Sequence, residues 1–263
     1  MGKHLGPQRI VCLTEEPTEI LYLLGEDHRI VGITVYTVRP PEARNRHPMV
    51  SAFVDGSVRK ICDLEPDLII GFSDIQADLA AKLIRANQQV LIFNQRSIAE
   101  ILEVILTIGR IVVAEEKALH LVNHYKDVIE RAKERSAKIA RRPRVYFEEW
   151  DKPTFSAIRW VSELIEIAGG KDVFSDKSHG KLASQREVQW SDVVEMNPDI
   201  ILASWCGKPV DIDSIRERPG WDSITAVRRG RIHEIDPSII LQPGPASLTD
   251  GLKAIQSLLI AGA

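Results

Sequence analysis

The sequence has few cysteines and no long hydrophobic run, and these absences exclude several classes of protein. Its three cysteines, Cys12, Cys62 and Cys206, lie far apart and form no CxxC or Cys/His metal-ligand spacing. Such a set favours free thiols and a reducing compartment. No run approaches the roughly 18 apolar residues of a membrane-spanning helix, and residues 1–9 lack the apolar segment of a secretory signal. We therefore expect a cytosolic protein, or a periplasmic or surface-anchored one if a signal was removed.

The sequence also lacks a charge excess and the common catalytic motifs. Lys and Arg total 34 against 37 Asp and Glu, a net charge of −3, whereas nucleic-acid and anionic-lipid binders need a basic surface. There is no GxSxG, GxxxxGK[ST], GxGxxG or HExxH motif. We therefore expect a protein that is not an enzyme. The length of 263 residues suits two lobes of roughly 100–130 residues.

Short apolar runs alternate with helical patterns in the first third of the chain. Buried strands are predicted over residues 9–13, 30–34, 67–72 and 90–93, with a clear helix over 76–85. This alternation is typical of a parallel sheet with helices on both faces. One long helix without Gly or Pro is then predicted over 114–139 and ends before Pro143.

The first pattern returns after that helix. A strand over 144–147 is followed by Pro153, which precedes a helix that closes at Gly169-Gly170, and segment 64–70 reappears as 196–202. We therefore predict an α/β fold of two similar Rossmann-like lobes with parallel sheets, joined by one long backbone helix. The predicted boundaries are an N-terminal lobe over 1–96, a helical linker over 97–142 and a C-terminal lobe over 143–263.

Ligands of parallel α/β sheets bind outside the carboxyl ends of the strands. In the first lobe these positions hold Glu15-Glu16 and Phe72-Ser73-Asp74, and in the second Glu148-Glu149-Trp150 and Ser204 to Gly207. We expect these residues to face one cleft, with at most one glutamate of each pair pointing into it. The alternative for each glutamate is a solvated acid near a helix N-terminus.

Three further features admit a functional and a structural interpretation. Cys206 is the best candidate for a reactive thiol, and His179, in a polar loop, could ligate a metal or a corrin cobalt. Gln242 opens a Gln-Pro-Gly-Pro turn that we place at the mouth of the cleft. The alternatives are an exposed thiol, a solvated histidine and a plain loop. His120 and His124, four residues apart, form a less favoured metal pair.

The order of these segments resembles a known family. Residues 9–13, 17–25, 31–34 and 40–42 are similar to the N-terminal lobe of vitamin B12-binding proteins, the substrate-binding components of cobalamin and siderophore ABC importers. The resemblance continues through 66–70, 160–170, 198–201 and 218–245, which is nearly the whole chain. It implies a non-catalytic protein that binds a corrinoid between two lobes.

The resemblance also implies roles for individual residues. Aromatic side chains line the cleft in B12-binding relatives, and Phe53, Phe72, Trp150 and Trp205 stand at matching positions. Arg39 replaces a tyrosine of many relatives. Permease-docking glutamates of relatives correspond here to Arg59 and Ser191, with Asp192 beside the second, which argues against ordinary docking to an ABC permease.

The predicted ligand is cobalamin or another corrinoid. The predicted ligand-binding residues are Glu15, Phe53, Phe72, Glu149, Trp150, Trp205, Cys206 and Gln242, with His179 as a candidate metal ligand. Acidic residues in the cleft would repel an anionic ferric siderophore and favour a neutral or cationic ligand. Two alternatives stay open: a siderophore, heme or metal-complex receptor on the same scaffold, and a cytosolic corrinoid-handling enzyme that uses Cys206.

Overall fold

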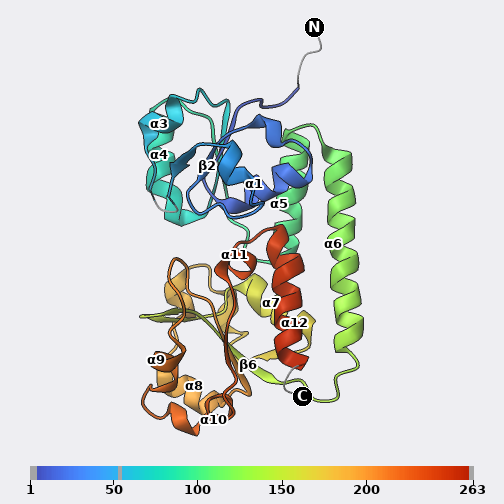
Figure 1. Cartoon of the computed structure of the whole chain (residues 1–263), viewed down its shortest axis with the longest axis vertical. Coiled ribbons are helices and arrows are strands. Elements are labelled where there is room, and N and C mark those ends of the chain that lie inside the picture. Colours follow the sequence, from blue (N-terminus) through green and yellow to red (C-terminus); the bar gives the residue numbers. More distant parts are fainter. Residues whose placement is uncertain (1–4, 53–54, 261–263) are drawn as a thin grey trace. The chain divides into compact units, whose positions relative to one another are not determined.

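The computed structural model describes residues 5–52 and 55–260, which form two compact units. Unit 1 contains the chain up to Gln95 and residues 99–124, and unit 2 contains residues 96–98 and the chain from Tyr125 onward. Helix α6 (Glu115–Ser136) continues from one unit into the other (Figure 1). Its apolar face is buried at Ala118, Val122 and Ile129, as the helical period requires. The predicted α/β fold with a long connecting helix is confirmed.

Unit 1 is built on a parallel five-stranded sheet. Its strands, in the order β3-β2-β1-β4-β5, are β1 (Ile10–Cys12), β2 (Ile30–Thr34), β3 (Met49–Ser51), β4 (Leu68–Phe72) and β5 (Val90–Phe93). The helices are α1 (Glu15–Leu23), α2 (Ala43–Arg46), α3 (Val58–Cys62), α4 (Ala77–Arg85) and α5 (Ile98–Ile111), the last of which begins at the edge of unit 2. Val11 and Leu13 pack with Ile61, Leu79 and Leu83 on one face of the sheet. Four strands match the prediction, and β3 was missed because Met-Val-Ser, exposed at Met49, does not form an apolar run like that of β1.

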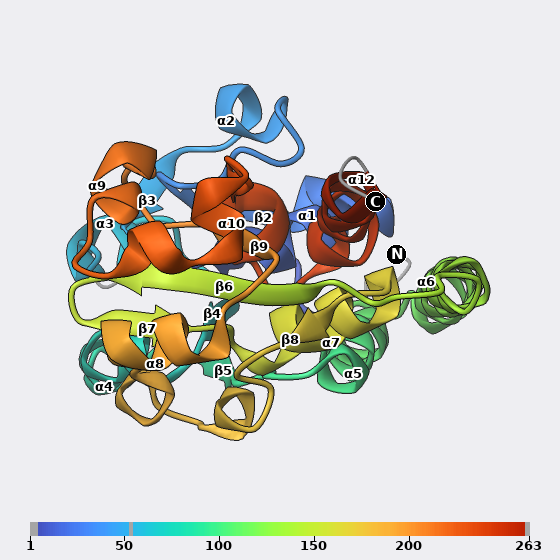
Figure 2. The same cartoon turned by 90° about the horizontal axis from the view of Figure 1, so that it is seen from below.

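Unit 2 has a mixed sheet, and the prediction of a purely parallel one is wrong there. Its strands are β6 (Arg144–Asp151), β7 (Thr154–Ser156), β8 (Lys171–Asp172), β9 (Ile200–Ala203) and β10 (Ile232–Glu234), in the order β10-β9-β6-β7 with β8 also paired to β6. Figure 2 shows β6 between β9 and β7. Strand β7 is antiparallel to β6, because the chain reverses at Lys152-Pro153. Pro153, expected just before a helix, therefore lies in a hairpin turn.

Helices and connecting turns make up the rest of unit 2. The helices that follow α6 are α7 (Arg159–Ala168), α8 (Trp190–Met196), α9 (Ile212–Arg216), α10 (Thr225–Arg228), α11 (Pro237–Ile240) and α12 (Leu252–Ile260), with a wider helical turn over Ser247–Gly251 before α12. None of the helices in residues 5–52 and 55–260 combines the length and hydropathy that a membrane span requires.

The repeated Pro-Asp segments have the same structural role in both units. In unit 1 the Asp67 carboxylate accepts hydrogen bonds from the backbone N–H groups of Gln8 (2.6 Å) and Arg9 (2.9 Å), just before β1. In unit 2 the Asp199 carboxylate accepts one from the N–H of Arg144 (2.9 Å), where β6 begins. Each aspartate thus joins two neighbouring parallel strands at their amino ends. This shared requirement explains the repeated sequence.

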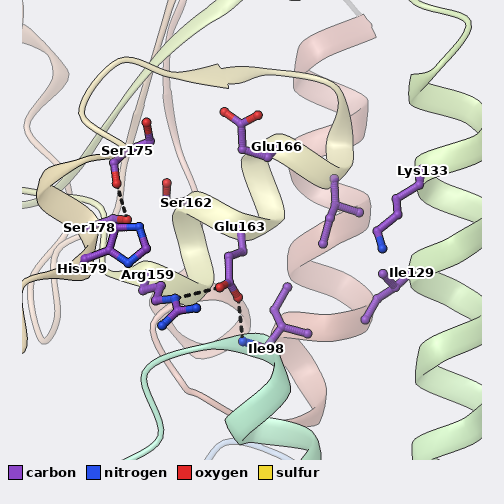
Figure 3. Close-up of a pocket in the computed structure, with 11 residues that line it drawn as sticks. Ile98, Ile129, Lys133, Arg159, Ser162, Glu163, Glu166, Ser175, Ser178 and His179 are labelled. Carbon is purple, nitrogen blue, oxygen red and sulfur yellow. Dashed lines mark hydrogen bonds and ion pairs between the residues drawn. The ribbon is translucent and has the colours of Figure 1, made fainter.

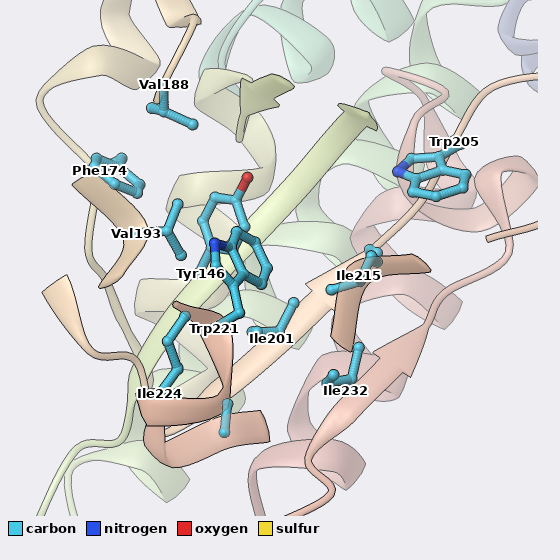
Figure 4. Close-up of a cluster of buried hydrophobic side chains, with 12 residues drawn as sticks. Tyr146, Phe174, Val188, Val193, Ile201, Trp205, Ile215, Trp221, Ile224 and Ile232 are labelled. Atoms are coloured by element: carbon cyan, nitrogen blue, oxygen red, sulfur yellow. The ribbon is translucent and has the colours of Figure 1, made fainter. Parts of the chain in front are cut away.

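The core of unit 2 is rich in aromatic side chains (Figure 4). The ring of Tyr146 lies edge-on to Phe174 and Trp221, with centroids 5.7 and 6.1 Å apart. Such pairs contribute about 0.5–1.5 kcal/mol beyond the burial of their surface. The Tyr146 hydroxyl donates a hydrogen bond to Glu148 (3.0 Å), so the core also supports the carboxyl end of β6.

Candidate functional site

Strands β6 and β9 are adjacent and parallel, so the last residues of β6 and the residues that follow β9 share one edge of the unit 2 sheet. Glu148, Glu149 and Trp150, expected after a strand over 144–147, lie within β6, because pairing with β7 extends the strand to Asp151. Glu148 lies opposite Ala203 in their ladder. We call the segments Glu148–Asp151 and Ser204–Lys208 the unit 2 edge. It contains Trp150, Trp205, Glu149 and Cys206 of the predicted site.

Glu148 is fully buried at this edge and is neutralised by Arg218. Two guanidinium nitrogens of Arg218 donate to the two carboxylate oxygens, over 2.5 and 2.8 Å. This bidentate geometry is the strongest arrangement of an arginine with a carboxylate. The guanidinium also lies against the rings of Trp190 (5.2 Å) and Trp221 (4.6 Å). Glu148 is therefore a structural anchor for this edge.

Glu149 has a different cation partner. Arg186, almost fully buried, donates to both of its carboxylate oxygens, one of them over 3.1 Å. The same guanidinium donates to the carbonyl of Ser156 (2.8 Å). Glu148 and Glu149 thus contact different arginines, as expected for neighbours in a strand. Neither carboxylate of the pair lacks a cation.

The two indoles of the unit 2 edge have fixed orientations. Trp205, 2% exposed, donates from Nε1 to Glu148 (3.2 Å), and Trp150 donates from Nε1 to the carbonyl of Lys152 (3.1 Å). The ammonium of Lys208 lies over both rings, 4.4 Å from the centroid of Trp150 and 4.7 Å from that of Trp205. This places a cation against two negative ring faces.

Lys208 also pairs with Asp151, over 2.7 Å. Burial raises the pKa of the Asp151 carboxyl, but the hydrogen bond and charge of Lys208 outweigh burial and hold this pKa below its usual value. A hollow of about 430 Å³ opens beside these residues, between Trp205, Lys208 and Arg218. The sequence analysis identified neither Lys208 nor Arg218 as a residue of this edge. Lys208 lies shortly after the end of β9, and this position could have indicated it, whereas no comparable signal marks Arg218.

In unit 1 the segment after β1 is also buried. The Glu15 carboxylate accepts a hydrogen bond from the N–H of Val38 (3.1 Å). Glu16, 2% exposed, has no salt-bridge partner within the described residues, and neither of its oxygens has a hydrogen-bond partner of good geometry there. Burial raises the pKa of Glu16 to about 7, and the nearby backbone N–H and Thr14 hydroxyl offset this only in part.

The apolar residues at the strand ends of unit 1 differ in exposure. Phe72, a predicted site residue, is buried at the end of β4, and its N–H donates to Gln76 (3.0 Å). Tyr36 and Ile75, which follow β2 and β4, are about half exposed, at 47% and 49%. Sequence reasoning missed both, although their positions just after strand ends were available as a signal.

The other predicted positions are scattered. Phe53 lies outside the described residues. Cys206 is exposed, Gln242 is half-buried in the turn after α11, and His179 is exposed in the turn Lys177–His179 and lines a separate hollow. Within the described ranges, no three His, Cys, Asp or Glu side chains are grouped so as to hold a metal ion.

The positions that depart from the relatives lie on the surface. Arg39 forms an ion pair with Glu19 (3.1 Å). The Arg59 side chain on α3 is 90% exposed, with Asp63 3.8 Å away. Ser191 is exposed on α8, where the Asp192 carboxylate accepts a hydrogen bond from the N–H of Gln189 (3.0 Å) and caps the helix.

Comparison with known proteins identifies the family. A family model described as periplasmic binding protein matches residues 10–239. The chain therefore belongs to the periplasmic binding protein family, and it is a substrate-binding protein of the type that serves ABC importers. The suspected relationship to B12-binding proteins is confirmed at this level.

The relatives differ in what their names say they bind. An uncharacterized ABC transporter substrate-binding lipoprotein, YvrC of Bacillus subtilis, is 28% identical over 95% of this chain and 79% of its own length. A cobalamin-binding protein of Halobacterium salinarum is 24% identical over 91% of this chain and 66% of its own length. The solved structure of the heme-binding protein RhuT from Roseiflexus has a TM-score of 0.80 at 23% identity, covering 97% of this chain and all of that one. These names give no support to a cytosolic location.

Proposed function

We propose that this protein binds a corrinoid and that the unit 2 edge is one wall of the binding site. One observation carries the proposal. The acids of this edge each have a cation of their own: Glu148 has Arg218, Glu149 has Arg186, and Asp151 has Lys208. The edge therefore offers aromatic surface with balanced charge.

Balanced charge favours some ligands over others. The side chains of a corrin are amides, and its large apolar ring suits packing against indoles. Heme carries two carboxylates, and ferric siderophores are commonly anionic, so either would be favoured by surplus cations near the ring. The three internal pairs leave little such surplus, because each arginine or lysine already has a carboxylate partner.

The fixed indoles determine how a ligand would contact this edge. Both indole N–H groups are used inside the unit, so the half-buried Trp150 would contact a ligand through its ring, whereas Trp205, 2% exposed, belongs to the core of unit 2 and would support this edge. Lys208 covers part of both rings, and a bound corrinoid would displace it or pack against its aliphatic stem.

The first experiment compares ligands on the full chain. Cobalamin, cobinamide, heme and a ferric hydroxamate siderophore are each added while visible spectra and the melting temperature are recorded. We expect the two corrinoids to raise the melting temperature, since a ligand at a hundredfold excess over its Kd stabilises the native state by about 2.7 kcal/mol. A shift with heme or the siderophore and none with a corrinoid would establish the alternative receptor.

Substitutions at the indoles test the location of the site. Trp150→Leu, at a half-buried position, should weaken cobalamin binding by about 1–3 kcal/mol, whereas Trp150→Phe should retain most of the affinity because it keeps a ring. The melting temperature of each ligand-free variant separates lost binding from lost folding. Equal affinity of Trp150→Leu and the unchanged protein would exclude this wall.

We propose further that the protein delivers its ligand to an importer through contacts that differ from those of relatives with two acidic docking residues. Arg59 is a cation on an exposed helix, and Ser191 is neutral. Permease co-purification and fractionation of the native cell test this proposal and the location together. Recovery of the protein only in the cytosol, without a permease, would contradict both.

A further inference from the structure

A second hollow of unit 2 lies apart from the edge that carries Trp150 and Trp205. It measures about 430 Å³, which lies within the usual range for ligand pockets. Figure 3 shows that α6 contributes Ile129 and Lys133, α7 contributes Arg159 and Glu163, and His179 comes from a turn. Ile98 and Ile167 add further apolar lining.

Each carboxylate oxygen at this hollow already accepts a hydrogen bond. The Glu163 oxygens accept hydrogen bonds from Arg159 Nε (2.9 Å) and from the backbone N–H of Ile98 (2.8 Å). The Glu166 oxygens are occupied by Arg142 and by the N–H of Asp172 (3.0 Å). The negative charge of Glu163 and Glu166 is therefore already partly offset by Arg159 and Arg142, which weakens their attraction for a cationic ligand.

The cationic groups, by contrast, keep donors available. Arg159 uses only Nε in its contact with Glu163, so its two terminal nitrogens have no partner among the described residues. Among the residues that the structure describes, Lys133 pairs only with Glu130, in a contact where both side chains are more than half exposed. Such an exposed pair is worth little and is easily exchanged. The imidazole of His179 lines the same hollow and has no hydrogen-bond or ion-pair partner among the described residues.

We infer that this hollow binds an organic anion with an apolar body, such as a medium-chain carboxylate. The isoleucine side chains would pack against the apolar part, Arg159 would donate charge-assisted hydrogen bonds to the carboxylate, and Lys133 would add a second positive charge from the α6 side of the hollow. This site is independent of the proposed corrinoid site, since the two share no lining residue among those described. Its ligand also contacts Ile98, whose backbone N–H is a local reporter of occupancy.

The experiment titrates decanoate into the full chain and measures the Kd by calorimetry, with the Ile98 amide followed by NMR. Decanol and decyltrimethylammonium carry the same chain with no charge or the opposite charge. We expect decanoate to bind at least tenfold more tightly than either and to shift the Ile98 amide signal. Equal affinity for the three compounds, or no binding of decanoate, would overturn the inference.

Variants locate the decanoate site. Lys133→Gln should weaken decanoate binding about tenfold, and Ser175→Trp, at an exposed position that lines the hollow, should abolish it by filling the space. The matched controls are Lys126→Gln, two turns earlier on α6, and Ser184→Trp, an exposed serine outside the hollow. Melting temperatures verify that each variant folds. Unchanged affinity in Ser175→Trp would place decanoate elsewhere and contradict the inference.

Discussion

Each unit buries an acid close to its first strand, and the two acids are held in opposite ways. Glu16 lies in the first turn of α1, shortly after β1, whereas Glu148 lies within β6. Both are almost inaccessible, at 2% and 0%. Glu148 has a bidentate arginine, whereas Glu16 has no cation within the described residues. The α/β architecture common to the two units therefore does not determine whether a buried carboxylate has a cation partner.

The difference has a consequence for each unit. Burial of an ionised group without a partner is costly, so Glu16 holds its proton to a pKa of about 7. The pKa of the neighbouring Cys12 thiol rises to about 12, chiefly through burial and partly through the charge of Glu16. Unit 1 thus has an edge whose charge changes near neutral pH. In unit 2 the acids of the edge are compensated by cations.

The largest expected effect comes from breaking the pair in unit 2. Arg218→Met leaves Glu148 buried without a cation and should lower the free energy of unfolding by about 3–5 kcal/mol. Adding Glu148→Gln to that variant should recover much of the loss, because a neutral pair carries no buried charge. Urea unfolding at pH 7 measures both. A loss below about 1 kcal/mol in Arg218→Met would contradict the assigned role of the pair.

The next effect concerns the unpaired acid of unit 1. Because the pKa of Glu16 is raised in the folded state, its protonated form stabilises the protein below the unfolded pKa of 4.5, and this contribution is lost as the pH rises to about 7. Glu16→Gln should therefore be near neutral at pH 5 and stabilising at pH 8, by on the order of 3 kcal/mol. Urea unfolding at the two pH values tests this. An equal effect at both would show that Glu16 does not titrate there.

Asp172 in unit 2 is a third buried acid, and it is stabilised by hydrogen bonds rather than by a cation. Burial raises its pKa to about 6, and hydrogen bonds from the Ser162 hydroxyl (2.5 Å) and the Phe174 N–H (3.1 Å) limit the rise. Carboxyl carbon NMR should show Glu16 titrating at higher pH than Asp172. Ser162→Ala should raise the pKa of Asp172 and leave that of Glu16 unchanged. The reverse order of midpoints would contradict the role of these hydrogen bonds.

The smallest effect is expected at the exposed cation of the unit 2 edge. Lys208→Gln removes one partly exposed ion pair and two contacts with indole rings, which together contribute about 1 kcal/mol to stability. It should also raise the pKa of Asp151. The matched control is Glu195→Gln, on the exposed face of α8, which should change stability by less than about 0.5 kcal/mol and leave corrinoid binding unaffected. A larger loss in the control than in Lys208→Gln would reverse this ranking.

Much of the fold could be predicted because it depends on local patterns. The runs that became β2 and β5 are correct to the residue, and the regular apolar spacing around Val122 located α6. The reversal at Pro153 was missed, since a proline fits both the first turn of a helix and a hairpin. Among the site residues, Trp150 and Trp205 share one edge of unit 2, whereas the ligand contacts of all the predicted residues stay predictions.

By itself the sequence determined the α/β class, the repeated Pro-Asp joints at Asp67 and Asp199, and the strand ends at which chemistry could occur. These depend on periodicity and on neighbours in the chain, which a sequence displays directly. Only the tertiary structure decided which charges meet. Glu148 and Arg218 are 70 residues apart, and nothing local marks them as partners. Whether a buried acid is neutralised, as Glu148 is, or protonated near neutral pH, as Glu16 is, depends on which side chains the packed chain brings within hydrogen-bond distance.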